Sequence, residues 1–268
     1  MMRKPIGVFD SGIGGLTVAK EIMNILPNED IVYFGDTARV PYGNKSKETI
    51  KKFSLQISRF LETKDVKAIV IACNTASAFA LQAVRENFNI PIIGVISPGA
   101  RAAVSATRNN KIGIIGTEGT VSSGAYSKEI TSIKEGTEIF STPCPLFVPI
   151  AEEGWSEKKV SYMIAEEYLE NMKTLGVDTL VMGCTHYPLL NKVVQDVMGD
   201  KVKLINPAKE TALELLDRLT EMDLKNDEDV KGEYKYYVSD NSSKFIEVGE
   251  RFLNREIDNI LEIDIEKY

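Results

Sequence analysis

The chain has 268 residues, of which 43% are hydrophobic and 26% are charged, and its formal net charge is −7. This composition is typical of a globular protein of one or two domains. The acidity argues against a nucleic-acid partner, because such proteins need a basic surface to displace counterions from phosphates. No apolar run approaches the roughly 18 residues of a membrane span, and no signal-peptide segment precedes the first strand. Three cysteines without CxxC spacing indicate reduced thiols, so we expect a cytoplasmic protein. Because no membrane span is found, we also expect no membrane partner.

The chain begins with the strand, turn and helix of an α/β unit. An apolar strand over 6–10 leads into a glycine-rich turn over 10–15 and a helix over 16–26, which Pro27 ends. A dinucleotide-binding fingerprint would need glycine where Thr17 stands, so the turn is not of that type, although its N–H groups would still suit an anion. We also expect no regulatory segment before this strand.

The following elements repeat the alternation of strand and helix. A loop punctuated by Pro41 and Gly43 follows the second strand, in the position where α/β proteins keep ligand-binding groups. A third buried strand ends at Cys73, and Ser97-Pro98-Gly99 predicts a turn and a hinge. The elements predicted for this part of the chain are strands over 31–35, 66–72 and 91–96 and helices over 47–64 and 76–87.

The same landmarks then recur, in the same order, about 110 residues later. The strand over 112–116 repeats the one over 6–10, and 137–140 repeats 30–34. Cys184, after the apolar run 177–183, repeats Cys73, and Leu204-Ile205-Asn206-Pro207 repeats Val95-Ile96-Ser97-Pro98. We therefore predict two similar α/β domains, the first formed by 1–97 plus 207–268 and the second by 98–206. The remaining elements predicted are a helix over 207–222 capped by Asn206, a polar surface connection over 224–231, a strand over 234–238 and a helix over 242–252.

Two thiols stand at equivalent strand ends, where open α/β sheets bind ligands. A lone cysteine is usually a small buried hydrophobe, and this is how we interpret Cys144 between two prolines. For Cys73 and Cys184, four alternatives remain open: a metal site with His186, a redox disulfide, a nucleophile with His186 as its base, and two-base proton transfer. Metal ligands prefer more regular spacing, and positions i and i+2 of one strand do not aim at each other. A repeated pair of identical groups favours stereoinversion, which needs one proton carrier on each face of a planar intermediate.

The motifs at these strand ends resemble those of the glutamate racemases, within the cofactor-independent aspartate/glutamate racemase family. The resemblance extends from the first strand to about Glu210 and rests on four segments, namely residues 10–17, 40–43, 72–76 and 183–188. It implies two α/β domains of three layers each, related by pseudo-two-fold symmetry, with the active site in the cleft between them. It also implies L-/D-glutamate interconversion that supplies peptidoglycan synthesis, with no cofactor and no metal, in an enzyme that is often a homodimer.

The resemblance also implies roles for individual residues. Cys73 and Cys184 would be the two acid/base groups, assisted by Asp10, Glu152 and His186, although Glu153 is adjacent to Glu152 and is an alternative to it. The substrate-binding candidates are Asp10, Ser11, Pro41, Tyr42, Gly43, Asn74, Thr75, Thr117, Thr120, Thr185 and His186. The sequence does not exclude aspartate or a hydantoin as the substrate, a binding module without chemistry, or a thiol redox protein.

Overall fold

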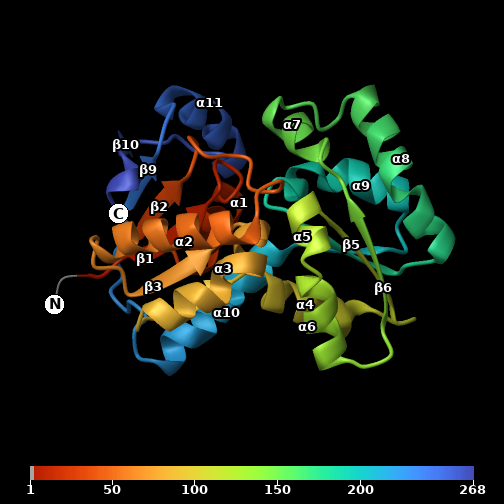
Figure 1. Cartoon of the computed structure of the whole chain (residues 1–268), viewed down its shortest axis with the longest axis horizontal. Helices are drawn as coiled ribbons and strands as arrows, with labels where there is room; N and C mark the ends of the chain where they lie inside the picture. Colours follow the sequence, from red (N-terminus) through yellow and green to blue (C-terminus); the bar gives the residue numbers. More distant parts are fainter. Residues whose placement is uncertain (1–2) are drawn as a thin grey trace. The chain divides into compact units, whose positions relative to one another are not determined.

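The computed structural model describes residues 3–268, which divide into two compact units (Figure 1). The first unit contains the residues up to Val95 together with Ala208–Tyr268, and the second contains Ile96–Pro207. Compactness does not test independent folding, so the predicted domains, 1–97 plus 207–268 and 98–206, stay a prediction. Within 3–268, no helix has the length and apolarity that crossing a bilayer requires.

The first unit is built on a six-stranded parallel sheet with the order β10-β9-β2-β1-β3-β4. All five residues of β1 and of β2 are buried, which is the pattern of parallel strands covered on both faces. The strands are β1 (Ile6–Asp10), β2 (Ile31–Gly35), β3 (Ala68–Ile71), β4 (Ile92–Gly94), β9 (Tyr234–Val238) and β10 (Ile260–Glu262). The helices are α1 (Leu16–Ile25), α2 (Lys47–Glu62), α3 (Asn74–Asn87), α10 (Pro207–Glu221) and α11 (Ser242–Leu253), with a 3-10 turn η2 (Ile265–Lys267).

Two neighbouring aromatic residues of β2 show how helices cover both faces of this sheet. Successive side chains of a strand point to opposite faces. The ring of Tyr33 packs against Phe245 of α11, with centroids 5.8 Å apart, and the ring of Phe34 packs against Phe60 of α2 at 5.4 Å. Helices α2 and α11 therefore lie on opposite faces of the sheet.

The second unit is built on a four-stranded parallel sheet with the order β6-β5-β7-β8. Leu180 and Met182 of β7 share a hydrophobic cluster with Leu169 and Met172 of α8 and with Val193 of α9. The strands are β5 (Lys111–Gly116), β6 (Glu138–Pro143), β7 (Thr179–Gly183) and β8 (Lys203–Ile205). The helices are α4 (Ile96–Ala106), α5 (Glu118–Ser122), α6 (Ala125–Ile133), α7 (Phe147–Glu152), α8 (Lys159–Leu175) and α9 (Asn191–Met198), with a 3-10 turn η1 (Tyr187–Leu190).

The two sheets share one strand order. The first unit contains β2-β1-β3-β4, and the second contains β6-β5-β7-β8, so the first, second, third and fourth strand of each unit occupy matching places. The predicted α/β fold class and the predicted repeat of the strand pattern are confirmed. Cys73 follows the third strand of one unit, and Cys184 follows the third strand of the other.

The turn predicted at Ser97-Pro98-Gly99 is wrong, because these residues form the first turn of helix α4. Proline lacks an N–H group, but the first turn of a helix leaves its N–H groups without intrahelical partners, so proline is tolerated there. Gly99 packs closely, since a Cβ atom there would lie 3.2 Å from the ring of Pro207. The helix expected from about residue 76 also begins earlier, at Asn74.

Candidate active site

In the first unit, the thiol of Cys73 caps the N-terminus of helix α3. Its Sγ atom accepts a hydrogen bond from Ala76 N at 3.5 Å and lies 3.7 Å from the hydroxyl oxygen of Ser11, while only 6% of the residue is exposed. Asn74 and Thr75 form the first turn of α3 and are buried. The positive end of the helix dipole and the N–H group of Ala76 stabilise negative charge on the sulfur.

The glycine-rich turn after β1 is held from inside the fold. Asp10 is fully buried, and its Oδ2 atom accepts a hydrogen bond from Gly12 N at 3.0 Å. The hydroxyl of Tyr33 donates to the Gly12 carbonyl at 2.8 Å. A Cβ atom at Gly15 would lie 2.4 Å from the Cβ of Asp10, so no larger residue fits there. Burial, and then the charges of Asp10 and Cys73, raise the pKa of Tyr33, which keeps this hydroxyl a donor.

In the loop after β2, the main chain of Tyr42 is available to a ligand, whereas its phenol is buried. A cis peptide bond joins Val40 to Pro41, which is exposed, and Tyr42 is 2% exposed with its hydroxyl donating to Asp36. Gly43 is half-buried. In the hydrogen-bond network of residues 3–268, neither Tyr42 nor Gly43 uses its main-chain N–H as a donor. Two N–H groups in succession are a suitable site for an anion.

In the second unit, Cys184, His186 and Glu152 form a continuous polar chain. The Sγ atom of Cys184 lies 3.9 Å from His186 Nδ1, and His186 Nε2 lies 3.0 Å from Glu152 Oε1. Glu152 is the last residue of α7, whereas Glu153 is exposed. Of the two adjacent glutamates, it is therefore Glu152 that contacts the histidine.

The expectation that Cys184 and His186 would not aim at each other is wrong. It assumed that both residues lie on one strand, but β7 ends at Gly183. The chain then turns, with Tyr187 N donating to Cys184 O at 3.1 Å, and this turn brings the imidazole to the thiol.

The groups around His186 favour its protonated form, the imidazolium. Burial by itself would lower the pKa of His186, but its hydrogen bonds to Cys184 and Glu152 and their negative charges outweigh that effect and raise the pKa to about 10. A positive charge beside Cys184 stabilises the thiolate form of this cysteine.

Two threonine candidates of the second unit, Thr117 and Thr185, follow strands, and the third, Thr120, lies in helix α5. Thr117 follows β5, and its hydroxyl oxygen accepts a hydrogen bond from Thr120 N at 3.2 Å. Thr120 and Thr185 are buried. Cys144 is fully buried in the core cluster of this unit, and burial raises the pKa of its thiol. Its interpretation as a core residue agrees with this location.

No metal centre and no disulfide is evident in the described part of the chain. None of the three cysteines forms a disulfide, and no group of three His, Cys, Asp or Glu side chains there is suited to hold a metal ion. Sequence reasoning missed Tyr33 and Asp36, which hold the turn and the loop in place. Each contributes through one hydroxyl or carboxylate in a buried network, and no local pattern marks such a residue.

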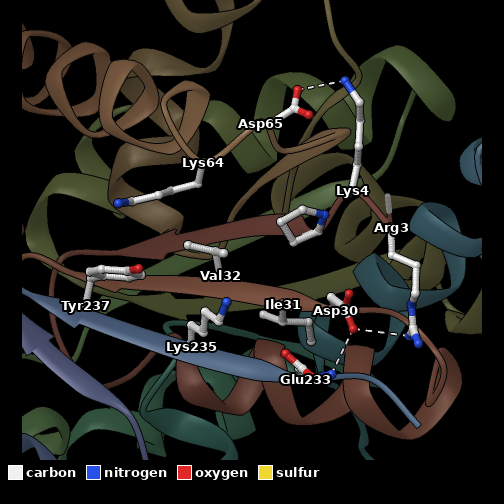
Figure 2. A pocket seen from close by; sticks show the side chains of 11 residues that line it. Arg3, Lys4, Asp30, Ile31, Val32, Lys64, Asp65, Glu233, Lys235 and Tyr237 are labelled. Atoms are coloured by element: carbon white, nitrogen blue, oxygen red, sulfur yellow. Dashed lines mark hydrogen bonds and ion pairs between the residues drawn. The ribbon is translucent and has the colours of Figure 1, made fainter. Parts of the chain in front are cut away.

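A cavity of about 270 Å³ in the first unit lies at the other ends of the strands (Figure 2). Asp30 and Ile31, at the start of β2, line it, and no thiol does. Two of its cations are already paired, since Arg3 lies 3.1 Å from Asp30 and Lys4 lies 2.7 Å from Asp65. This cavity is therefore separate from the polar groups at the carboxyl ends of the strands.

Residues 6–215 match the family described as Asp/Glu/Hydantoin racemase. The chain belongs to this family. It is 50% identical over 263 residues to a glutamate racemase of Geobacter metallireducens, with 98% of this chain and 97% of the relative covered. It is 44% identical to a glutamate racemase of Thermoanaerobacter pseudethanolicus, with both chains covered completely.

Solved structures of glutamate racemases are also similar to this chain. A glutamate racemase isoform from Bacillus anthracis superposes with a TM-score of 0.95 at 38% identity, covering 98% of both chains. The glutamate racemase of Francisella tularensis, solved in complex with D-glutamate, superposes with a TM-score of 0.94 at 42% identity, covering both chains completely. Members of this family with such identity are isomerases, and so is this protein.

Proposed function

We propose that the protein interconverts L- and D-glutamate by moving a proton between the two faces of Cα, with Cys73 and Cys184 as the proton carriers and without a cofactor. The observation that carries this proposal is the repeated strand end. Each unit has a nearly buried thiol after its third strand, and each thiol has its own stabilising partner for negative charge. Glutamate as the substrate rests on the names of the full-length relatives and on the D-glutamate in the Francisella tularensis structure.

In the proposed reaction, one cysteine enters as a thiolate and the other as a thiol. The thiolate removes the α-proton from one face, and the electron pair of the broken C–H bond spreads from Cα into the carboxylate. The thiol then donates its proton to the opposite face of Cα, which restores the C–H bond in inverted configuration. The cysteines exchange roles in the reverse direction. A free thiol has a pKa of about 8.5, so the local stabilisation of a thiolate decides how much base is present.

The neighbouring groups would bind the substrate and stabilise the charge that develops on it. In the first unit, Ser11, Asn74 and Thr75 lie around the N-terminus of α3, where hydroxyl, amide and N–H donors suit a carboxylate. The loop with Pro41 would offer the N–H groups of Tyr42 and Gly43. In the second unit, the proposed binding groups are Thr117, Thr120, Thr185 and His186. Asp10 would assist Cys73, and Glu152 would assist Cys184 through His186.

We further propose that the D-glutamate formed supplies peptidoglycan synthesis in the cytoplasm, and that the enzyme is a homodimer. The family resemblance supports both statements. Light scattering of the purified protein checks the second one, because a mass of one chain would exclude the dimer.

The test of the proposed function is proton exchange at Cα. Purified protein is incubated with L-glutamate or L-aspartate in D2O, and the Cα signal is followed by NMR together with the optical rotation. We expect loss of the Cα proton signal and racemisation with L-glutamate. Exchange with L-aspartate alone would overturn the substrate. Binding of L-glutamate without any exchange would favour a binding module, and a reversible Cys73–Cys184 disulfide without exchange would favour thiol redox chemistry.

A further inference from the structure

A buried polar network lies directly behind the loop that carries Tyr42. At its centre is the carboxylate of Asp36, which is fully buried and accepts hydrogen bonds from the Tyr42 hydroxyl and from Ser239 Oγ at 2.9 Å. The Nε atom of Arg39 donates to both oxygens of this carboxylate, at 3.0 and 2.8 Å. Asp36 is therefore fixed from three sides.

Arg39 is fixed in turn by three further contacts. Its Nη1 atom donates to Gln56 Oε1 at 2.7 Å and to Glu266 Oε1 at 3.0 Å. Its guanidinium lies 4.0 Å from the ring centre of Phe53, which itself packs against the Tyr42 ring at 5.7 Å. The arginine thus holds Tyr42 twice, through Asp36 at the hydroxyl and through Phe53 at the ring face.

The side chain of Tyr42 is entirely occupied by these contacts, so that the residue offers only its main chain to a ligand. Its N–H and that of Gly43 are not donors in the hydrogen-bond network of residues 3–268. Where these two N–H groups point depends on how the Tyr42 side chain is anchored. An anchor that shifts by a fraction of an ångström moves both donors, and hydrogen bonds weaken steeply with misalignment.

We propose that Arg39 is a positioning residue, which sets the two N–H donors of the Tyr42–Gly43 loop for a substrate carboxylate by holding Asp36 and Phe53 against the Tyr42 side chain. This rests on the proposed function, in which that loop binds the substrate. Arg39 would act through these intramolecular contacts and not by touching the substrate. Through Glu266 of η2, the same contacts tie the loop to the end of the chain that follows β10.

Steady-state kinetics of four proteins test this inference: the parent, Arg39→Lys, Tyr42→Phe and the double variant. Lysine keeps the positive charge beside Asp36, so the fold is retained, but a single ammonium cannot reproduce the guanidinium contacts to Asp36, Gln56 and Glu266. Because the loop binds substrate and transition state alike, we expect each single variant to raise KM about fivefold while kcat stays within about twofold. If Arg39 acts through Tyr42, the double variant shows no larger KM than the worse single one.

Lys64→Met is the matched control, because Lys64 is another cation of this unit that lies over aromatic rings, at 5.0 Å from Phe60 and 4.8 Å from Tyr237. We expect its KM to stay at the parent value. A lower melting temperature of Arg39→Lys with KM unchanged would overturn the inference and leave a structural role. KM effects that multiply in the double variant would also overturn it. If either of these results is found while the parent protein turns over L-glutamate normally, only the inference about Arg39 fails and the proposed function stands. A parent protein that neither binds nor exchanges L-glutamate would refute both the inference and the proposed function.

Discussion

The two thiols follow the same strand in two sheets of the same order, and yet their surroundings differ. Cys73 has a helix N-terminus, with Ala76 N as a donor and Ser11 Oγ at 3.7 Å. Cys184 has an imidazole at 3.9 Å, which is backed by the carboxylate of Glu152. One sulfur is therefore stabilised by fixed main-chain dipoles, and the other is stabilised by a side chain that can itself gain or lose a proton.

Some features of the two thiol sites follow from the repeat, and others are specific to one unit. Strand order and the position of the thiol are common to both units, so they follow from the repeated pattern of buried strand and turn. The stabilising group is specific to each unit. Main-chain dipoles do not titrate, whereas the effect of His186 on Cys184 depends on pH, so the two halves of the reaction should respond to pH differently.

The largest expected effect comes from removing either thiol. For Cys73→Ala and Cys184→Ala, we expect racemisation of L-glutamate to fall by about 10³-fold or more, because each deletes a proton carrier that the proposed mechanism cannot replace. The measurement is the rate of change of optical rotation. Cys144→Ala is the control, since this thiol lies in the core, and its kcat should remain within about twofold of the parent value. An active Cys73→Ala or Cys184→Ala protein would refute the two-base mechanism.

The repeat was readable from sequence because its signal is local. An apolar run followed by cysteine and two polar residues predicts both a buried strand and a polar strand end, and it occurs twice at a nearly constant distance. Cys73, Cys184 and the neighbouring hydrogen-bonding residues were found in this way. Their assignment to particular roles came from the family resemblance.

The contacts that hold these residues were not readable. Asp36 and Arg39 interact with Ser239 and Glu266, which are more than 200 residues away in the chain, and no local pattern marks such pairs. The turn predicted at Ser97-Pro98-Gly99 failed because proline is compatible with a first helical turn as well as with a loop. The aim of His186 was misjudged because positions 184 and 186 were treated as residues of one extended strand, whereas the chain turns directly after β7 ends at Gly183.

A second difference between the units lies at the start of the same two strands. Lys67, just before β3, is 9% exposed, and its Nζ atom lies 2.5 Å from Oε2 of the buried Glu29. Asp178, just before β7, is half-buried and accepts hydrogen bonds from Thr107 Oγ1 and Arg108 N. Lys67→Met leaves the Glu29 carboxylate buried without its cation. We expect the free energy of unfolding to fall by about 3–5 kcal/mol.

For Asp178→Asn, the matched variant, we expect a loss of only about 1 kcal/mol, since an amide still accepts hydrogen bonds and the residue is only half-buried. Urea unfolding of both variants measures the two values. Equal losses would mean that the ion pair of the first unit contributes no more than ordinary hydrogen bonds do.

A further prediction concerns Glu152, and it tests whether the group that stabilises Cys184 titrates. Glu152→Gln removes one of the two partners that raise the pKa of His186, so the imidazolium loses its proton at lower pH. We expect kcat at pH 8 to fall about tenfold and the alkaline limb of the pH–rate profile to move to lower pH. Asp10→Asn, in the unit that contains Cys73, should lower kcat without moving that limb, because the single histidine of the chain, His186, lies in the other unit.

The titration of His186 can also be measured through the pH dependence of the free energy of unfolding. The folded-state pKa of His186 is about 10, above its ordinary value of 6.5, so its contribution to stability is fully present below pH 6.5 and is lost as pH rises toward 10. The difference in unfolding free energy between the parent and His186→Asn should therefore shrink over this window, by about 1.4 kcal/mol per pH unit. Titrating groups that do not interact with His186 are common to both proteins and cancel in the difference, whereas Cys184 and Glu152 lose their partner in the variant. A difference that is constant with pH would mean that His186 is neutral in the folded protein, and Cys184 would then need another source of positive charge.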